Sequence, residues 1–272
     1  MRRFSALLVL AILWLAASCG DDNEAGGTFT PGTDGVLTVA TNLPAPGFWD
    51  GDDIDHLRGG FEWGIATELA KRFDLKVTFV DVPFEQLAVG DLGDADIALA
   101  QISTTDQRRE RMDFSAPYLP SNAGALATHA VELRDLADAK DIKWVVEEST
   151  TEESLLHDVI RPDHDPLVTA TRQETLAALA DGSAEAALLD LPTALATAHA
   201  NPELTVPAQF ASDERLAVAL PIDSANTEAV SSAIRAFDTD GTLTDLYDKY
   251  LRPLFAEDPE NVRVIAVRPG ES

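Results

Sequence analysis

Short β-like runs alternate with helical patterns along most of the chain, and this alternation is the feature that most limits its possible folds. The runs 37–41 and 77–80, for example, are rich in Leu, Val and Ala, while Ile65, Leu69 and Phe73 recur at the four-residue spacing of a helix face. Strands separated by helices are connected by crossovers and so form largely parallel sheets with helices on their faces. The sequence therefore predicts an α/β protein.

The length and charge of the chain set further limits. At about 150 residues per domain, 272 residues predict two domains. Hydrophobic residues make up 45% and charged residues 25%, a composition that excludes a mostly disordered chain. Asp and Glu number 47 against 20 Lys and Arg, so the formal net charge is −27. Such a charge repels phosphate backbones and attracts cationic ligands at low salt, so we expect no nucleic-acid partner.

The N-terminus has the pattern of an export signal. Two arginines precede an apolar run over 6–17, which is too short to span a bilayer comfortably. The single cysteine, Cys19, follows Leu-Ala-Ala-Ser and resembles the cysteine of the bacterial lipobox, whose thiol is lipidated and becomes the new N-terminus. We predict a signal peptide at 1–18, then a lipidated N-terminus and flexible linker at 19–35. An ordinary signal peptide with a chance cysteine is the alternative.

Four segments carry motifs, in a fixed order along the chain. They are Gly60-Phe61-Glu62-Trp63-Gly64-Ile65-Ala66, the run 96–118 with Ser103-Thr104-Thr105-Asp106-Gln107-Arg108 and Asp113-Phe114-Ser115-Ala116-Pro117-Tyr118, the stretch from Gly182 to Asp190, and Asp240-Gly241-Thr242-Leu243 with the pattern that follows it. As an ordered set, over about residues 36–251, they resemble the extracellular solute-binding proteins of amino-acid-type ABC transporters, family 3.

This resemblance implies the periplasmic-binding-protein-like fold of type II, an α/β fold in which two mixed sheets flanked by helices form two lobes joined by a double-strand hinge. Lobe 1 is expected to comprise 36–122 plus 218–253, and lobe 2 to comprise 123–217. Residues 254–272 form a C-terminal extension, in which 262–267 is either an extra strand or a tail. The ligand is expected in the cleft between the lobes.

The run 101–108 supplies the residues expected to hold a ligand carboxylate. A guanidinium offers two parallel charge-assisted hydrogen bonds to a carboxylate, and Arg108 follows one turn after a helix-capping sequence. The resemblance implies that Arg108 anchors the carboxylate, that Ser103 adds hydroxyl and backbone contacts, and that Gln101 belongs to the same site. The alternative is that Arg108 lies on a solvated basic face together with Arg109 and Arg111. For Arg109 and Arg111 themselves we prefer this solvated interpretation.

Asp190 is the residue expected to hold a ligand ammonium. A carboxylate only accepts hydrogen bonds, and Asp190 follows the predicted strand 186–189 directly. The resemblance implies that this aspartate reaches the α-ammonium from lobe 2. The alternative is that it caps the next helix, and the two roles are compatible.

The acidic run 147–153 departs from the resembling family. Ser149 with Glu152, and Thr150 with Glu153, have capping-box spacing, and the resemblance implies that Thr150 and Thr151 lie near the ligand carboxylate. Many family members have a glycine in place of Ser149 and a basic or neutral residue in place of Glu147. Adjacent carboxylates of Glu147 and Glu148 in the cleft favour a cationic ligand side chain; the alternative is that both face solvent.

Three aromatic residues are candidates for the walls of the cleft. Phe84 falls where the resembling family has a cleft aromatic, and Phe48 and Trp49 lie in the loop after the first strand. Aromatic faces stack on ligand carbon chains and attract cations. Core packing is an equally strong interpretation for each of them.

The sequence therefore predicts the substrate-binding lipoprotein of an ABC importer. It would be a monomer, anchored by lipid on the periplasmic or outer face of the cell membrane. It would bind an amino acid or similar small zwitterion, with a cationic side chain as one alternative, and deliver it to the permease subunits. No cofactor, metal or catalytic motif is evident in its pattern. Two alternatives are a sensory lipoprotein without transport and an enzyme of the same fold acting as a prephenate-type dehydratase, although the Glu147–Glu148 pair disfavours a dicarboxylate substrate.

Overall fold

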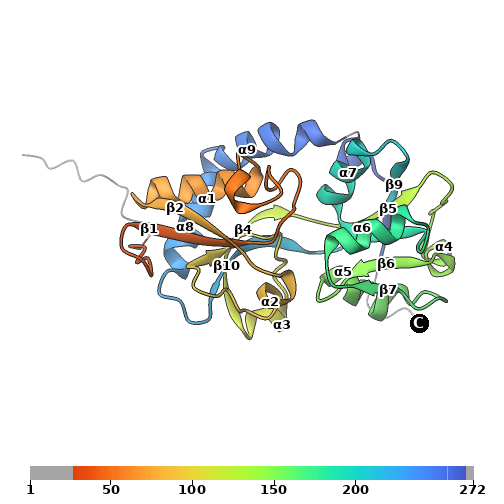
Figure 1. Ribbon diagram of the computed structural model, residues 1–272, viewed down its shortest axis with the longest axis horizontal. Helices are drawn as coiled ribbons and strands as arrows, with labels where there is room; N and C mark the ends of the chain where they lie inside the picture. Colours follow the sequence, from red (N-terminus) through yellow and green to blue (C-terminus); the bar gives the residue numbers. More distant parts are fainter. Residues whose placement is uncertain (1–26, 256, 268–272) are drawn as a thin grey trace, which may run out of the picture.

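The computed structural model describes residues 27–255 and 257–267, which form two lobes side by side (Figure 1). The sheet of lobe 1 has five strands in the order β2-β1-β3-β10-β4, and the sheet of lobe 2 has six strands in the order β11-β9-β5-β8-β6-β7. Both sheets contain parallel and antiparallel pairs. The predicted two-lobed α/β fold with two mixed sheets is confirmed. Cys19 and the predicted signal peptide lie outside the described residues.

Lobe 1 is built from two segments of the chain, one before and one after the middle segment that forms most of lobe 2. Its elements are β1 (Val36–Thr41), η1 (Ile54–His56), α1 (Phe61–Arg72), β2 (Lys76–Asp81), α2 (Phe84–Ala88), β3 (Ile97–Ala98), α3 (Asp106–Arg109), β4 (Met112–Pro120), β10 (Arg215–Pro221), α8 (Thr227–Thr239) and α9 (Thr242–Tyr250). Strand β1 pairs in parallel with β2 and β3, and β10 runs antiparallel to β3 and β4.

Lobe 2 is built mainly from the middle of the chain. Its elements are β5 (Ala123–Thr128), α4 (Leu136–Asp141), β6 (Trp144–Glu147), α5 (Thr151–Leu155), the π-helical turn η2 (Leu156–Ile160), β7 (Leu167–Thr169), α6 (Arg172–Ala180), β8 (Ala186–Asp190), α7 (Leu191–Ala200), β9 (Leu204–Ala211) and β11 (Val264–Ala266). The helices begin where the sequence offers capping side chains: the Thr150 hydroxyl accepts from the Glu153 N–H at the start of α5.

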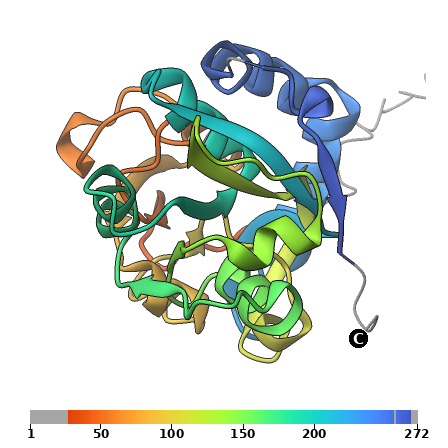
Figure 2. The same ribbon diagram turned by 90° about the vertical axis from the view of Figure 1, so that its right-hand side faces the viewer.

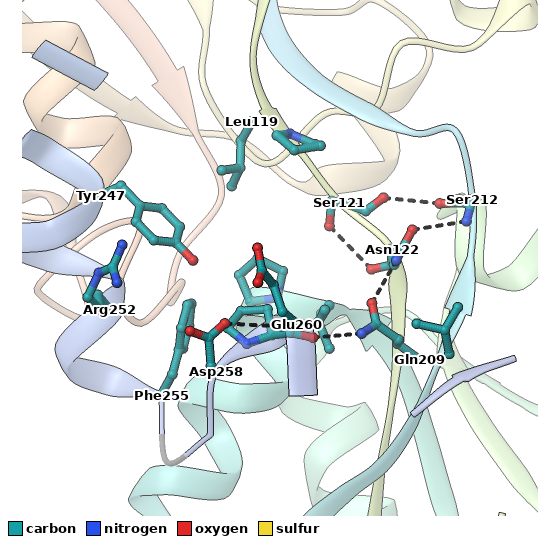
Figure 3. A pocket seen from close by; sticks show the side chains of 15 residues that line it. Leu119, Ser121, Asn122, Gln209, Ser212, Tyr247, Arg252, Phe255, Asp258 and Glu260 are labelled. Carbon is teal, nitrogen blue, oxygen red and sulfur yellow. Dashed lines mark hydrogen bonds between the residues drawn. The ribbon is translucent and has the colours of Figure 1, made fainter. Parts of the chain in front are cut away.

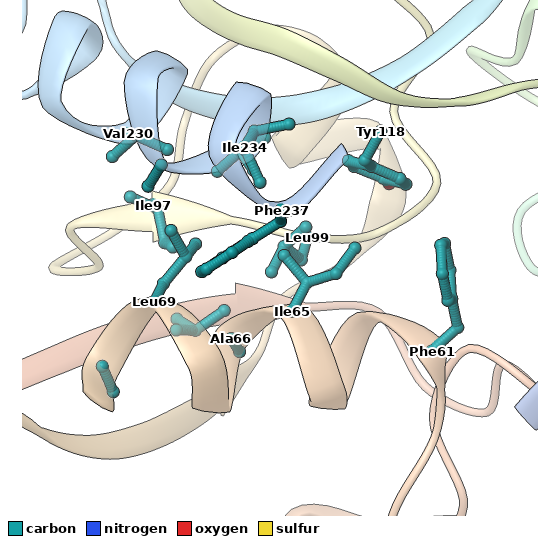
Figure 4. Packing of buried hydrophobic residues seen from close by; sticks show 14 of the residues in the cluster. Phe61, Ile65, Ala66, Leu69, Ile97, Leu99, Tyr118, Val230, Ile234 and Phe237 are labelled. Atoms are coloured by element: carbon teal, nitrogen blue, oxygen red, sulfur yellow. The ribbon is translucent and has the colours of Figure 1, made fainter. Parts of the chain in front are cut away.

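The core of lobe 1 explains the helical spacing seen in the sequence. The buried face of α1, with Ile65 and Leu69, packs with Ile97 of β3 and with Ile234 and Phe237 of α8 (Figure 4). All of these side chains are buried. Burial of apolar side chains at about 25 cal/mol per Å² is the main favourable term in folding, so this face holds α1 and α8 on the sheet.

Two chain crossings form the hinge between the lobes, at residues 121–122 and 212–214. They lie next to one another, since the Ser121 N–H donates to the Glu214 carbonyl at 3.1 Å and the Ser212 hydroxyl donates to the Ser121 carbonyl at 3.0 Å. The predicted second boundary at 217/218 is wrong by a few residues. Strand β10 already begins at Arg215, which pairs with Pro120 of β4, because the antiparallel ladder between β10 and β4 extends almost to the hinge.

The C-terminal extension crosses from lobe 1 to lobe 2 as well. After α9 and the 3-10 turn η3 (Arg252–Leu254), the chain passes through η4 (Pro259–Asn261) into β11, which pairs in parallel with β9 at the edge of the lobe 2 sheet (Figure 2). We call Phe255 and residues 257–267 the C-terminal strap. Of the two interpretations of residues 262–267, the extra strand is confirmed and the tail is wrong.

The strap is attached to the hinge through Gln209. The Gln209 amide donates to the Pro259 carbonyl at 2.7 Å and to the Val262 carbonyl at 3.0 Å, while its oxygen accepts from the Asn122 amide at 2.6 Å (Figure 3). Phe255 packs against the cores of both lobes. A cavity of about 1080 Å³ lies between the strap, the hinge and the end of α9.

We expect the docking of β11 to contribute measurably to stability. Ile265 is buried in the core of lobe 2, whereas its neighbour Val264 is 56% exposed. Ile265→Ala should lower the free energy of unfolding by about 2–4 kcal/mol, because it removes buried methyl groups and leaves a cavity. Val264→Ala is the matched control and should change it by less than about 0.5 kcal/mol. Urea denaturation measures both; equal effects would mean that β11 is not docked.

Candidate functional site

Arg108 lies buried at the boundary between the lobes. It belongs to the one-turn helix α3, which begins where the Thr105 hydroxyl accepts from the Arg108 N–H at 3.1 Å. Only 7% of the residue is exposed, so it does not lie on a solvated face. Arg109, in contrast, is exposed, as expected.

The Arg108 guanidinium links the two lobes. One terminal nitrogen donates to the Ser103 carbonyl of lobe 1 and the other to the Ser149 carbonyl of lobe 2, each at 3.0 Å. Burial lowers the pKa of Arg108, and the negative charges of Glu152 and Glu214 oppose that shift. Two carbonyl oxygens and two nearby carboxylates therefore stabilise the positive charge of Arg108.

The turn whose carbonyl accepts from Arg108 has a left-handed backbone conformation at Ser149. Ser149 has a φ of +62°, in the left-handed region that glycine adopts most readily. The conformation turns the Ser149 carbonyl toward Arg108, while the Ser149 N–H donates to a Glu153 carboxylate oxygen at 2.7 Å. The capping-box spacing of Thr150 with Glu153 correctly predicted the start of α5.

A carboxylate from the hinge holds the hydroxyls of both lobes. Glu214 lies just before β10, and its Oε2 accepts from the Ser103 hydroxyl at 2.6 Å and from the Thr151 hydroxyl at 2.7 Å. Ser103 and Thr151 were predicted as site residues from separate motifs, and the structure brings them together on one oxygen atom. Thr150 lies beside them, with its hydroxyl donating to the Glu147 carbonyl at 2.7 Å.

Asp190 ends β8 and caps α7, with its Oδ1 accepting from the Thr193 N–H at 3.0 Å. The capping interpretation is therefore correct. The side chain is half-buried, and its negative charge raises the pKa values of Glu152 and Glu147. The positive charge of Arg108 lowers the pKa of Glu152, in the direction opposite to the effect of Asp190.

Glu152 is an acid of this region whose pKa is strongly raised. Burial, followed by the negative charges of Glu214 and Asp190, raises its pKa to about 8, although the Arg108 charge acts in the opposite direction. The Thr151 hydroxyl also lies 3.3 Å from the Glu152 carboxylate. With a pKa of about 8, the Glu152 carboxyl is mainly protonated at neutral pH. The carboxylates around it therefore carry more negative charge than Arg108 balances.

Glu147 does not act as an unpaired acid in the cleft. It is buried, and its Oε2 lies 3.8 Å from the Nε of Arg172, whose Nη1 donates to Gln101 of lobe 1 at 3.1 Å. Glu148 lies at the rim, where contact with Glu85 of lobe 1 raises its pKa. The expectation that these adjacent glutamates jointly recognise a cationic side chain stays a prediction, and α6 brings to Glu147 an arginine that the expectation did not include.

Gln101 is held in place by a buried acid. It has a φ of +51°, and Glu62 accepts from its backbone N–H at 2.8 Å and from its side-chain amide at 2.5 Å. Glu62 also accepts from the Trp49 indole at 2.8 Å and from the Tyr118 hydroxyl. Burial raises the pKa of Glu62, and these hydrogen bonds oppose the shift. Gln101 thus presents its amide oxygen to Arg172 from a rigid support.

The predicted aromatic residues fall into two groups. Phe48 and Trp49 are almost completely buried in the core of lobe 1, where Phe48 packs edge-on against Phe61. The core interpretation is correct for them, because the loop after β1 folds inward onto the start of α1. Phe84 lies beneath the site, with its ring centre 5.6 Å from the Arg108 guanidinium carbon.

A pocket of about 420 Å³ opens where these groups meet. Lobe 1 contributes Arg108, lobe 2 contributes Ser149, Thr150 and Thr151, and the hinge contributes Glu214. Its polar lining combines the Arg108 guanidinium, hydroxyls and the carboxylates of Glu214 and Asp158. Such a pocket can bind a small molecule that carries both signs of charge.

Four charged residues of this region are absent from the sequence-based site: Glu62, Glu152, Arg172 and Glu214. Glu62 belongs to the Gly60-Phe61-Glu62 motif. An acid at the start of a helix expected to be buried was the sequence feature that could have identified it. Glu152 was explained as a capping residue. Arg172 and Glu214 stand in no motif, so their approach depends on the fold alone.

Comparison with known proteins agrees with this architecture. The family model for bacterial extracellular solute-binding proteins, family 3, matches residues 37–253. The L-cystine-binding protein TcyJ of Escherichia coli is 30% identical over 228 residues, covering 79% of this chain and 82% of the relative. A probable histidine-binding protein of Neisseria gonorrhoeae is 29% identical over 143 residues, about half of each chain. The chain therefore belongs to family 3 of the bacterial extracellular solute-binding proteins.

Solved structures give the same result. The solute receptor for L-cysteine of Neisseria gonorrhoeae has a TM-score of 0.73 and 28% identity, covering 83% of this chain and 94% of that one. An amino acid ABC transporter substrate-binding protein of Streptococcus pneumoniae, bound to L-arginine, has a TM-score of 0.72 and 27% identity, covering 80% and 94%. These relatives are amino-acid-binding substrate-binding proteins, and the predicted resemblance is confirmed. Over 27–255 and 257–267, no helix is long and apolar enough to cross a bilayer.

We expect Glu152 to make stability depend on pH. Its pKa of about 8 in the folded protein exceeds the ordinary value of 4.5, so the stability it contributes is present at low pH and is lost as the pH rises through about 8. Glu152→Gln should therefore show a smaller fall in Tm between pH 6 and pH 9 than the wild type, by a few degrees. The exposed variant Glu203→Gln should keep the wild-type profile. Parallel profiles for wild type and Glu152→Gln would contradict the prediction.

Proposed function

We propose that this protein binds an amino acid or similar small zwitterion between its lobes and presents it to the permease subunits of an ABC importer. The observation that carries the proposal is the buried Arg108 guanidinium at the lobe boundary, with hydroxyls from both lobes beside it. Two of its five N–H donors bond to carbonyl groups, which leaves three for a carboxylate.

The opposite end of the zwitterion pairs with Asp190. A ligand that contacts Arg108 from lobe 1 and Asp190 from lobe 2 has more favourable contacts when the lobes are closed, so it shifts the population toward that state. Charge-assisted hydrogen bonds contribute about 1.5–3 kcal/mol each, so a few of them support micromolar binding after ordering costs. The closed form is the form that the permease would recognise.

We propose further that the chain acts as a monomeric lipoprotein, exported by residues 1–18 and anchored in the membrane through a lipid on Cys19. The support is the sequence pattern of an apolar run followed by a single cysteine. The prediction of a flexible linker at 19–35 is wrong for its second half, because Phe29 is buried and stacks on Phe73 of lobe 1 at 4.9 Å between ring centres. The polar residues between Cys19 and Phe29 would connect the lipid to lobe 1.

Removal of the Arg108 side chain should abolish binding. In calorimetric titrations with the twenty amino acids, the wild type is expected to bind at least one, and Arg108→Ala to weaken that binding at least 100-fold, because the ligand carboxylate loses its charged partner. Arg109→Ala removes the same charge at an exposed neighbouring position and should bind as the wild type does. Unchanged affinity in Arg108→Ala would remove this residue from the site.

The lipid anchor has a direct test. Full-length protein expressed in a bacterial host should sediment with the membranes, and mass spectrometry of its N-terminal peptide should show Cys19 carrying acyl chains. Cys19→Ala should shift the protein to the soluble extracytoplasmic fraction, because no lipid can then be attached. Recovery of an unmodified Cys19 from the wild type would contradict the proposal.

A further inference from the structure

Glu214 lines the interlobe pocket from the hinge and belongs to neither lobe. It lies on the hinge crossing at 212–214, and its backbone carbonyl accepts from Ser121 of the other crossing. One carboxylate oxygen, Oε2, accepts the hydroxyl of Ser103 from lobe 1 and that of Thr151 from lobe 2. The side chain also lines the interlobe pocket with Arg108. A negative charge is thus presented to the pocket from the hinge itself.

The second carboxylate oxygen of Glu214 is available to a ligand. No described residue donates a hydrogen bond to Oε1, whereas Oε2 has two donors. A carboxylate only accepts hydrogen bonds, and each of its oxygens has two lone pairs, so Oε1 suits an N–H donor that carries a positive charge.

The charges around the pocket leave an acidic surplus. Asp158 and Glu214 line the pocket together with Arg108, and the charge of Asp190 acts on Glu147 and Glu152 nearby. These are five carboxylates against two guanidiniums, those of Arg108 and of Arg172 beside Glu147.

Arg172 lies beside Glu147, whereas Arg108 interacts with the charges of Glu152 and Glu214. A buried carboxylate without a partner is unfavourable and takes up a proton instead, as Glu152 does. An added positive charge would relieve this surplus, whereas a neutral ligand side chain would leave it in place.

We propose that Glu214 recognises a positively charged side chain on the bound solute, so that the site selects cationic amino acids over neutral ones. This inference rests on the proposed function and names the class of solute for the same site. The α-carboxylate of the solute pairs with Arg108 and its α-ammonium with Asp190. Its guanidinium or side-chain ammonium donates to Glu214.

Arginine and its neutral isostere citrulline test the proposal, because they differ in charge and hardly in shape. Calorimetric titration of the full chain should show wild-type protein binding arginine at least tenfold more tightly than citrulline. Glu214→Gln keeps the size of the side chain and an oxygen that can accept from Ser103 and Thr151. It should weaken arginine at least tenfold and citrulline less than threefold.

The adjacent hinge residue offers a matched control. Asp213 is exposed and outside the pocket, so Asp213→Asn removes one negative charge from the same crossing and should leave both affinities within twofold of the wild type. Glu214→Asp, which keeps the charge, should retain the preference for arginine.

The possible outcomes separate the two proposals. If the wild type binds no amino acid, the proposed function and this inference are both wrong. If it binds amino acids but prefers citrulline or shows no preference, only the inference is wrong, whether or not the Glu214 variants fold. A Glu214→Gln protein that loses equal affinity for both ligands would also overturn the inference, since Glu214 would then only hold the lobes together.

Discussion

The burial of one guanidinium between two lobes is the constraint on which the rest of the site depends. A charge taken out of water costs several kcal/mol unless hydrogen bonds and opposite charges surround it. For Arg108 these come from the Ser103 carbonyl of lobe 1, the Ser149 carbonyl of lobe 2 and the acids nearby. The left-handed turn at Ser149 serves the same requirement, because it directs a backbone oxygen across the boundary.

Negative charge exceeds positive charge around this guanidinium, and the excess links ligand binding to lobe closure. In this arrangement the Thr151 hydroxyl of lobe 2 donates to Glu214 of the hinge, and burial raises the pKa of Glu152. A solute cation beside these acids would offset their negative charge, so the contact proposed to select the solute would also favour the closed form.

Local motifs allowed a prediction of the fold and of part of the site. Arg108 and Ser103 stand in one continuous run, and Asp190 follows a recognisable strand, so sequence spacing placed them. For Glu147 the sequence did not indicate the partner, Arg172, because it is 25 positions away in the chain, on the helix that follows β7. Glu214 stands between two strands, where no periodicity distinguishes a pocket residue from a solvent-exposed one.

For a related reason the sequence left two interpretations of the C-terminal strap open, an extra strand and a tail. Strand β11 has three residues and a single buried side chain, Ile265, so its alternation is too short to decide between them. Its position depends on the Gln209 side chain, which holds two strap carbonyls beside the hinge. The family model ends at residue 253, before the strap begins. A third crossing is therefore added to a two-crossing hinge, and any rotation of the lobes must also be accommodated by the strap between Phe255 and Val262.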